Sequence, residues 1–127
     1  MRASAADSAV LACLLAWCLG TAGPARAVSP QSEREIQGLI AALADSPCRF
    51  ERNGNWYDGK RAAAHLQRKY TYLREHDPAT TPETFIAHAA SRSSVSGRAY
   101  QVACPGQPPS DAATWFSARL QAQRAAP

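Results

Sequence analysis

The sequence predicts an α-rich α+β fold with about four helices and a small two-stranded antiparallel sheet, in the order α-β-α-α-β-α. Apolar residues recur at helical spacing in four segments, and two short segments instead alternate with the two-residue period of a strand. The first alternating segment ends at an Asn53-Gly54 pair, the strongest short signal for a hairpin turn.

Residues 1–27 have the pattern of a secretory signal peptide. Arg2 precedes an apolar run from Ala9 to Leu19, and the segment ends in the A-x-A sequence Ala25-Arg26-Ala27. A membrane-spanning helix needs about 20 apolar residues, and this run is shorter, so an uncleaved anchor is the weaker alternative. We expect export to the periplasm, cleavage after Ala27 and no stable membrane insertion afterwards.

The remaining residues 28–127 have the length of one globular domain. Cleavage would remove two arginines and one aspartate, which lowers the formal charge from +4 to +3. The positive side chains are dispersed along the chain, whereas nucleic-acid binders cluster them. The composition therefore argues against a nucleic-acid partner.

Two cysteines, Cys48 and Cys104, fall within residues 28–127. In an oxidising compartment an even pair favours a disulfide. The alternative is a metal site, but the two thiols lack C-x-x-C spacing and a neighbouring histidine, so they make a poor zinc set. We expect a disulfide-stabilised domain without a metal or other cofactor.

The first helix is expected in residues 32–45, where Ser32 and Glu35 have capping-box spacing and Pro47 follows the end. The chain then alternates from Cys48 to Arg52 as a half-buried strand. The apolar positions of the helix are Ile36, Leu39, Ile40 and Leu43.

A two-residue loop at Asn53-Gly54 would place Arg52 opposite Asn55 and Phe50 opposite Tyr57. The returning arm is short, because Asp58 has the character of the N-cap of the next helix.

Two helices follow the hairpin, in residues 59–76 and in the segment after Thr81. Thr81 is the expected N-cap of the second of these, with Pro82 at its first position. The residues expected to face the core are Ala62, Leu66, Tyr70 and Leu73 in the first and Phe85, Ile86 and Ala89 in the second.

The last two elements are a strand around residues 100–104 and a helix capped by Ser110. Tyr100, Val102 and Cys104 share one face of the strand, so pairing with the first strand would bring Cys104 to Cys48. The buried side of the helix is expected to contain Ala112, Trp115, Phe116 and Leu120.

Four quoted stretches together carry a family resemblance: "CRFERNGNWY", "AAHLQRKY", "ETFI" and "ASRSSVSGRAY". They resemble the YfeK-like family of small exported bacterial proteins of unknown function, over about residues 36–120. The resemblance implies an exported single domain and carries no catalytic assignment. The chain departs from the family pattern at Arg61, where a capping-box glutamate is expected.

One hypothesis for the chemistry is a small serine hydrolase. His65 lies between Arg61 and Lys69 at i−4 and i+4, and two cations disfavour its protonation, so a neutral imidazole would be available as a general base. The candidate nucleophiles are the hydroxyls of Ser93, Ser94 and Ser96. No G-x-S-x-G elbow is present, so we favour a structural role for these residues, in which the serines cap turns.

A binding surface is the second hypothesis. Cations and loop amides would take up a small anion or an acidic polymer, although dispersed arginines also fit an ordinary solvated face. Trp56 would either bind a peptide or glycan partner, or pack over the adjacent helix and cover the core. The candidate binding residues are Arg52, Asn53, Trp56, Lys69 and Arg98, with Arg92 nearby.

The favoured function from the sequence is therefore a non-enzymatic periplasmic binding or accessory domain. Its contact surface would consist of the Asn53-Gly54 turn, the helix face with His65 and Lys69, and the loop from Ser93 to Gly97. The expected partner is a periplasmic protein, a glycan or a small anion. The hydrolase is the alternative, and a structural protein without a dedicated ligand is a weaker third.

Overall fold

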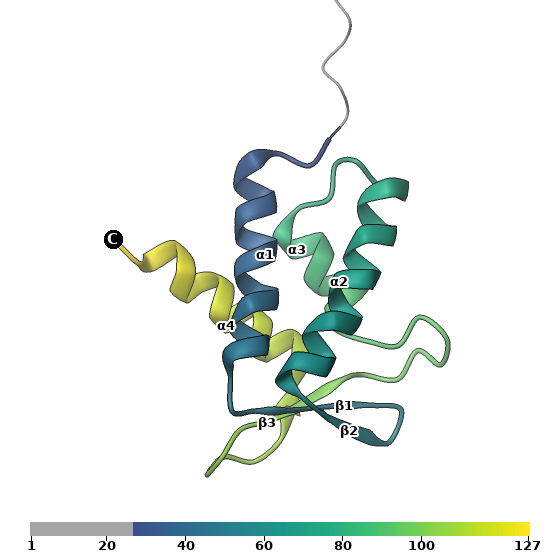
Figure 1. Ribbon diagram of the computed structural model, residues 1–127, viewed down its shortest axis with the longest axis vertical. Coiled ribbons are helices and arrows are strands. Elements are labelled where there is room, and N and C mark those ends of the chain that lie inside the picture. The colour runs from purple at the N-terminus through teal and green to yellow at the C-terminus, as the bar shows by residue number, and fades with distance from the viewer. Residues whose placement is uncertain (1–26) are drawn as a thin grey trace, which may run out of the picture.

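The computed structural model describes residues 27–127 of the chain, so the predicted signal peptide lies, except for Ala27, outside the described residues. Two long helices stand side by side above a small sheet (Figure 1). The α+β class is confirmed. The elements are α1 (Pro30–Asp45), β1 (Arg49–Arg52), β2 (Asn55–Asp58), α2 (Gly59–His76), α3 (Pro82–Phe85), the π-helical turn η1 (Ile86–Ala90), β3 (Gln101–Ala103), β4 (Ser110–Asp111) and α4 (Ala112–Ala125).

The sheet has four antiparallel strands in the order β2-β1-β3-β4, so the prediction of two strands was wrong. One added strand is the returning arm of the hairpin, with Arg52 opposite Asn55 and Phe50 opposite Tyr57 as expected. Asn53 and Gly54 both have positive φ, 51° and 85°, as a tight hairpin turn requires. The other is β4, whose two residues are too few to show an alternating pattern.

The start of α1 differs from the prediction. The N-cap is Ser29, three residues before the expected Ser32, and its side chain accepts a hydrogen bond from the Ser32 backbone N–H. Pro30 occupies the first turn, where a missing N–H costs nothing. The helix ends at Asp45, as expected.

The caps of α2 and α3 agree with the sequence. The Asp58 carboxylate accepts from the Arg61 N–H at 2.8 Å, and Thr81 forms a capping box with Thr84. The N-cap of α4 is Asp111 instead of Ser110, because the helix begins at Ala112, directly after the two residues of β4. The first N–H of α4, on Ala112, donates to the Tyr100 carbonyl at 2.9 Å. No side chain is therefore needed to satisfy that donor.

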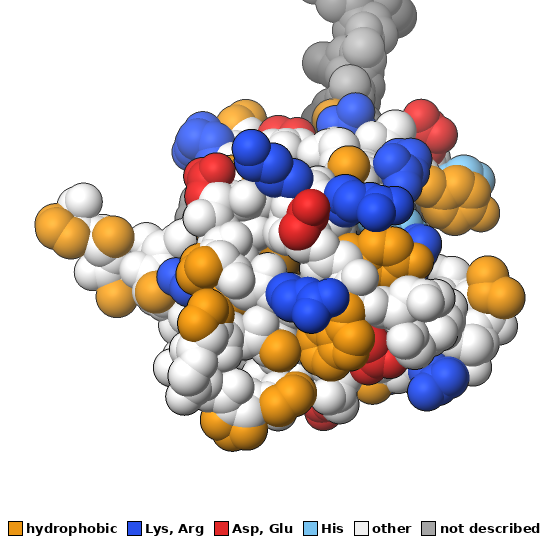
Figure 2. All heavy atoms as spheres, turned by 60° about the horizontal axis from the view of Figure 1, so that its bottom comes forward, with side chains coloured by type: hydrophobic (Ala, Val, Ile, Leu, Met, Phe, Trp, Pro, Cys, Tyr) orange, Lys and Arg blue, Asp and Glu red, His pale blue; other side chains and the backbone are white. Residues whose placement is uncertain are grey.

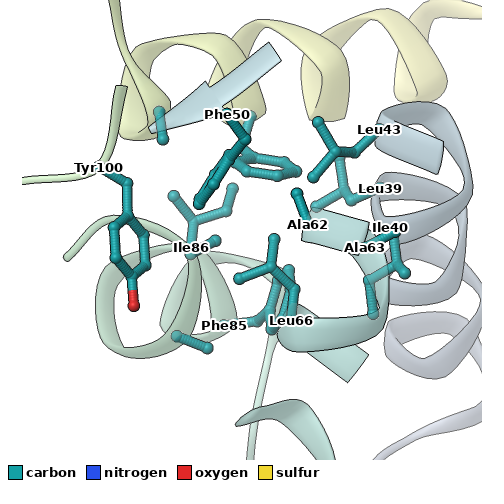
Figure 3. Packing of buried hydrophobic residues seen from close by; sticks show 14 of the residues in the cluster. Leu39, Ile40, Leu43, Phe50, Ala62, Ala63, Leu66, Phe85, Ile86 and Tyr100 are labelled. Carbon is teal, nitrogen blue, oxygen red and sulfur yellow. The ribbon is translucent and has the colours of Figure 1, made fainter. Parts of the chain in front are cut away.

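The core lies between the helices and one face of the sheet. Phe85 packs edge-on against both Tyr70 and Phe116, and Phe50 contacts Tyr100 with ring centroids 5.0 Å apart. All predicted inward positions of the helices are buried except Leu73 and Trp115, which are partly buried. Figure 3 shows Tyr100 at the rim of this cluster with its hydroxyl pointing away from the neighbouring side chains.

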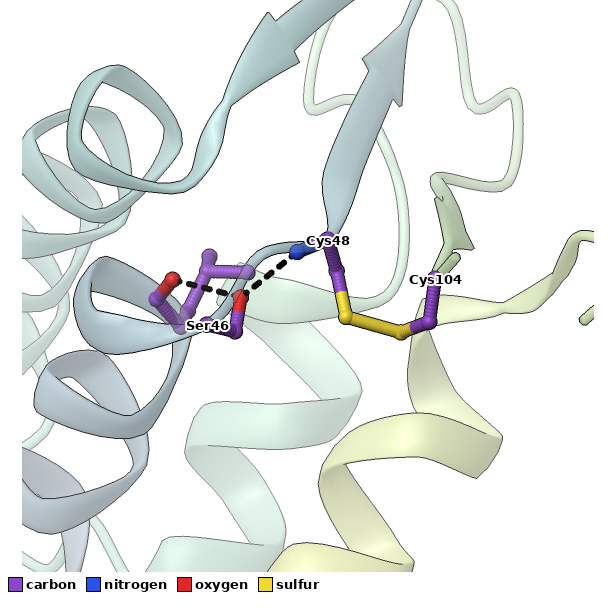
Figure 4. Close-up of a disulfide and its surroundings, with 4 residues drawn as sticks. Ser46, Cys48 and Cys104 are labelled. Carbon is purple, nitrogen blue, oxygen red and sulfur yellow. Dashed lines mark hydrogen bonds between the residues drawn. A yellow bond between two sulfur atoms is a disulfide. The ribbon is translucent and has the colours of Figure 1, made fainter. Parts of the chain in front are cut away.

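Cys48 and Cys104 form a disulfide, as predicted. Phe50 pairs with Val102, and the same register continued by two residues places Cys48 opposite Cys104. The Ser46 hydroxyl donates to the Leu43 carbonyl and accepts from the Cys48 N–H, which joins the end of α1 to the bridge (Figure 4).

Within residues 27–127, no helix has the length and hydropathy needed to cross a membrane.

Candidate functional site

An open pocket of about 340 Å³ lies where the end of the hairpin, the face of α2 and the loop after η1 meet. In Figure 1 the hairpin and this loop extend to the same side of the molecule, beside α2. Residues from all three parts of the predicted contact surface therefore line one pocket. Its lining residues are Arg52, Asn53, Asn55, Tyr57, His65, Lys69, Ser93, Ser94, Val95 and Tyr100.

His65 and Lys69 reach the pocket together because they are one helical turn apart on α2. Their neighbours Leu66 and Tyr70 are fully buried, so His65 and Lys69 lie at the edge of the buried stripe. Both side chains are half-buried as a result. This position gives them a fixed protein environment on one side and access to solvent on the other.

Arg52 is held in place from two directions. Its Nη1 lies 2.7 Å from His65 Nδ1 and 3.1 Å from Nε2, and its guanidinium carbon lies 5.1 Å from the centre of the Tyr57 ring. A guanidinium only donates, so the imidazole nitrogen that faces it accepts. We assign Nδ1 as that acceptor because its distance is shorter, which leaves the proton on Nε2.

Lys69 and Tyr100 form the other wall. Lys69 Nζ donates to the Arg92 carbonyl at 2.9 Å and to the Tyr100 hydroxyl at 3.1 Å. His65 Nε2 lies 3.4 Å from the same hydroxyl. A chain of polar contacts thus runs from Arg52 through His65 and Tyr100 to Lys69.

Burial, together with the neighbouring cations, lowers two pKa values in the site. Burial, then Arg52 and Lys69, lower the pKa of His65 from 6.5 to about 4, so its imidazole is neutral at pH 7. Burial, then the charge of Arg52, lower the pKa of Lys69 from 10.5 to about 8. Burial raises the pKa of the Tyr100 hydroxyl, which stays protonated.

The loop wall is fixed by hydrogen bonds among polar side chains. Asn53 donates to the Ser93 hydroxyl at 3.3 Å and accepts from the Ser96 hydroxyl at 2.6 Å. The Ser93 oxygen also accepts from the backbone N–H groups of Val95 and Ser96. Ser93 and Ser96 therefore shape the turn, and Asn53 ties the hairpin to it.

The structure brings the candidate hydrolase residues close without joining them. His65, Ser93 and Ser94 line the same pocket, and Ser94 is exposed. The hydrogen bonds of His65 within the described residues go to Arg52 and Tyr100, not to a serine.

Two predicted binding residues lie apart from the pocket lining. Trp56 is 37% exposed, and the guanidinium of Arg49 lies 6.0 Å from its ring centre. Arg98 is exposed in the loop and is not among the lining residues. On the molecular face in Figure 2, Lys and Arg side chains are spread out, with acidic and hydrophobic side chains between them.

Tyr100 and Tyr57 are site residues that the sequence analysis placed only in the sheet. A tyrosine has an apolar ring and a polar end, so one that ends a buried stripe can supply both core packing and a site hydroxyl. This combination of an apolar ring and a polar end was the signal in the sequence that could have identified them as site residues. The sequence did not show whether the hydroxyl would face a pocket, because that depends on the position of the loop after η1.

The pocket is rich in donors and contains no acid. None of its ten lining residues, all within the described part of the chain, is an aspartate or glutamate. No salt bridge of residues 27–127 involves Arg52 or Lys69. No cluster of three His, Cys, Asp or Glu side chains suited to a metal ion occurs in the same residues. The arrangement fits an anion.

Residues 30–124 match the model of a family of unknown function, DUF5329. Searches of curated proteins and of solved structures return no match.

Proposed function

Because the chain belongs to DUF5329, a family of unknown function, its activity has to be inferred from the site, and we propose that the protein binds a small oxyanion through Arg52, Lys69 and Tyr100. Carboxylates and phosphates are the chemical class that these donors fit. The site would serve a non-enzymatic binding or accessory domain.

The observation that carries the proposal is the surplus of hydrogen-bond donors in the pocket. Tyr100 oxygen receives contacts from Lys69 and His65, so its own O–H has no protein acceptor among the described hydrogen bonds. Lys69 has one N–H beyond its two bonds, and only one guanidinium nitrogen of Arg52 contacts His65. Unused donors and two cations without a carboxylate favour an anionic acceptor.

A titration of the mature protein with acetate and with phosphate tests this proposal. NMR spectra recorded at constant ionic strength should show saturable shifts at residues of the pocket. Arg52→Gln should weaken the affinity by about tenfold or more, since a hydrogen bond to a charged group contributes about 1.5–3 kcal/mol.

Arg98→Gln is the matched control for that titration. It removes the same charge from the neighbouring loop but changes no pocket-lining side chain. We expect its affinity to stay close to that of the unaltered protein. Equal losses in the two variants would mean that only the general positive charge attracts the anion, and the proposed site would be wrong.

The site also suits larger partners that present an acidic group. A glycan or a periplasmic protein would place one carboxylate in the pocket and extend over the exposed side chains of the hairpin, including Trp56.

We also propose that the protein is exported to the periplasm and that it is related to the YfeK-like family. N-terminal sequencing of the protein from the periplasmic fraction should identify Val28 as its first residue. A periplasmic protein that still begins with Met1 would contradict cleavage after Ala27.

The serine hydrolase is the second candidate, favoured by one observation. A neutral His65 shares the pocket with Ser93 and Ser94. A fluorophosphonate probe should then label one of these serines, and the labelling should disappear in His65→Ala. Absence of labelling in the folded protein would reject this candidate.

A further inference from the structure

The second observation about the pocket is that its cations differ chemically. Arg52 carries a permanent guanidinium, whereas Lys69 carries an amine that becomes a nucleophile when it loses its proton. We propose that Lys69 forms an imine with 2-oxo acids, ligands that carry a carbonyl group next to a carboxylate. This inference rests on the proposed anion site and adds a covalent step to it.

Lys69 is placed as a reactive lysine would be. Its side chain is half-buried, and Nζ is held between the Arg92 carbonyl and the Tyr100 hydroxyl. Partial burial and a neighbouring cation are the two environments that activate a lysine amine. Both act here, and with a pKa of about 8 an appreciable fraction of Lys69 is neutral in weakly alkaline solution.

Arg52 supplies the partner for the ligand's carboxylate. The guanidinium is fixed by His65 and by the ring of Tyr57, and it keeps unused N–H groups that are suited to the two oxygens of a carboxylate. A ligand held by Arg52 would bring the adjacent carbonyl carbon into the pocket that Lys69 also lines. Anion binding would thus raise the local concentration of the carbonyl beside the amine.

The chemical balance needs no further reactant. The Lys69 nitrogen attacks the carbonyl carbon, and the carbonyl oxygen takes up a proton to give a carbinolamine. Loss of that hydroxyl as water, with the nitrogen proton removed, gives the imine, so one amine and one carbonyl yield one imine and one water. Tyr100 is placed to exchange these protons, since its hydroxyl oxygen lies 3.1 Å from Nζ.

The chain offers an internal control, because Lys60 is its only other lysine. Lys60 is exposed in the first turn of the same helix and does not line the pocket. The mature protein is incubated with pyruvate and cyanoborohydride at pH 8, and the reduced adducts are located by peptide mapping. This separates Lys69 from Lys60 and from the N-terminal amine.

Lys69 should carry about tenfold more adduct than Lys60, because the pocket that contains Arg52 holds the ligand beside Lys69 and not beside Lys60. Arg52→Gln should reduce labelling by pyruvate more than labelling by propanal, which has no carboxylate. Circular dichroism confirms that the variant is folded. Equal labelling of the two lysines in the folded protein would overturn the proposal.

Acetate, which has no reactive carbonyl, distinguishes failure of this proposal from failure of the anion site. Saturable acetate shifts in the pocket without preferential Lys69 labelling would leave the anion site in place and reject the imine. Absence of both would reject both proposals.

Discussion

Replacing both cysteines of the Cys48–Cys104 bridge by alanine should remove a large part of the protein's stability. The bridge joins residues 56 positions apart. In the chain-entropy description, closing a loop of that length in the unfolded state contributes about 4 kcal/mol at 25 °C. A small domain has a total of about 5–15 kcal/mol, so the loss is a substantial fraction. The melting temperature should fall by about 15 °C or more.

Urea denaturation of the oxidised protein and of the Cys48→Ala/Cys104→Ala variant, followed by circular dichroism, measures this difference. The single variant Cys104→Ala should lose nearly as much, because either substitution opens the loop. Intact mass before unfolding establishes that the unaltered protein has lost two hydrogens relative to its reduced form. A difference below about 1 kcal/mol between the oxidised protein and the double variant would refute the loop-closure argument.

Two further predictions concern the site and the packing of α2. Because the folded-state pKa of His65 is about 4 and the ordinary value is 6.5, the unfolded chain binds the proton more readily between these pH values. The free energy of unfolding should therefore decrease as the pH falls from 6.5 towards 4, and it should decrease less in His65→Gln. Urea titrations at several pH values measure this, and an equal pH dependence of the unfolding free energy in the two proteins would contradict it. Gly59→Ala should destabilise by about 1–3 kcal/mol, because its Cβ would lie 2.2 Å from the Leu43 carbonyl oxygen; an unchanged melting temperature would exclude that clash.

The elements that the sequence predicted well are those governed by local chemistry. Asn53-Gly54 determined both the hairpin and its register, because the two residues adopt the positive φ values that a two-residue turn needs. Asp58 and Thr81 were recognisable as caps for the same reason: the interaction that they make is with their own helix.

The elements that the sequence missed depend on distant parts of the chain. β4 exists because Ser110 pairs with Val102, and the cap of α4 is supplied in part by the carbonyl of Tyr100. The Ser29 cap was missed for a different reason. Ser32 has capping-box spacing with Glu35, so it was the expected N-cap. Pro30, which occupies the first turn, is the feature that distinguishes Ser29 from Ser32 as the cap.

The candidate site shows the same division. The i, i+4 spacing of His65 and Lys69 predicted a shared helix face, and both line the pocket. The participation of Tyr100 was not foreseen, because it requires the loop after η1 to return the chain to the sheet. Arg98 was a candidate binding residue because it is a cation, although in the structure it lies outside the pocket lining.

The hydrogen bonds of Asn53 to Ser93 and Ser96 join segments about 40 residues apart. The pocket wall that they hold therefore exists only when the hairpin and the loop have reached their native positions. Any ligand of the pocket would bind the folded chain and not the unfolded one, and it would raise the unfolding temperature as its concentration increases. A thermal-shift screen of anions can accordingly search for the natural ligand without knowledge of its identity.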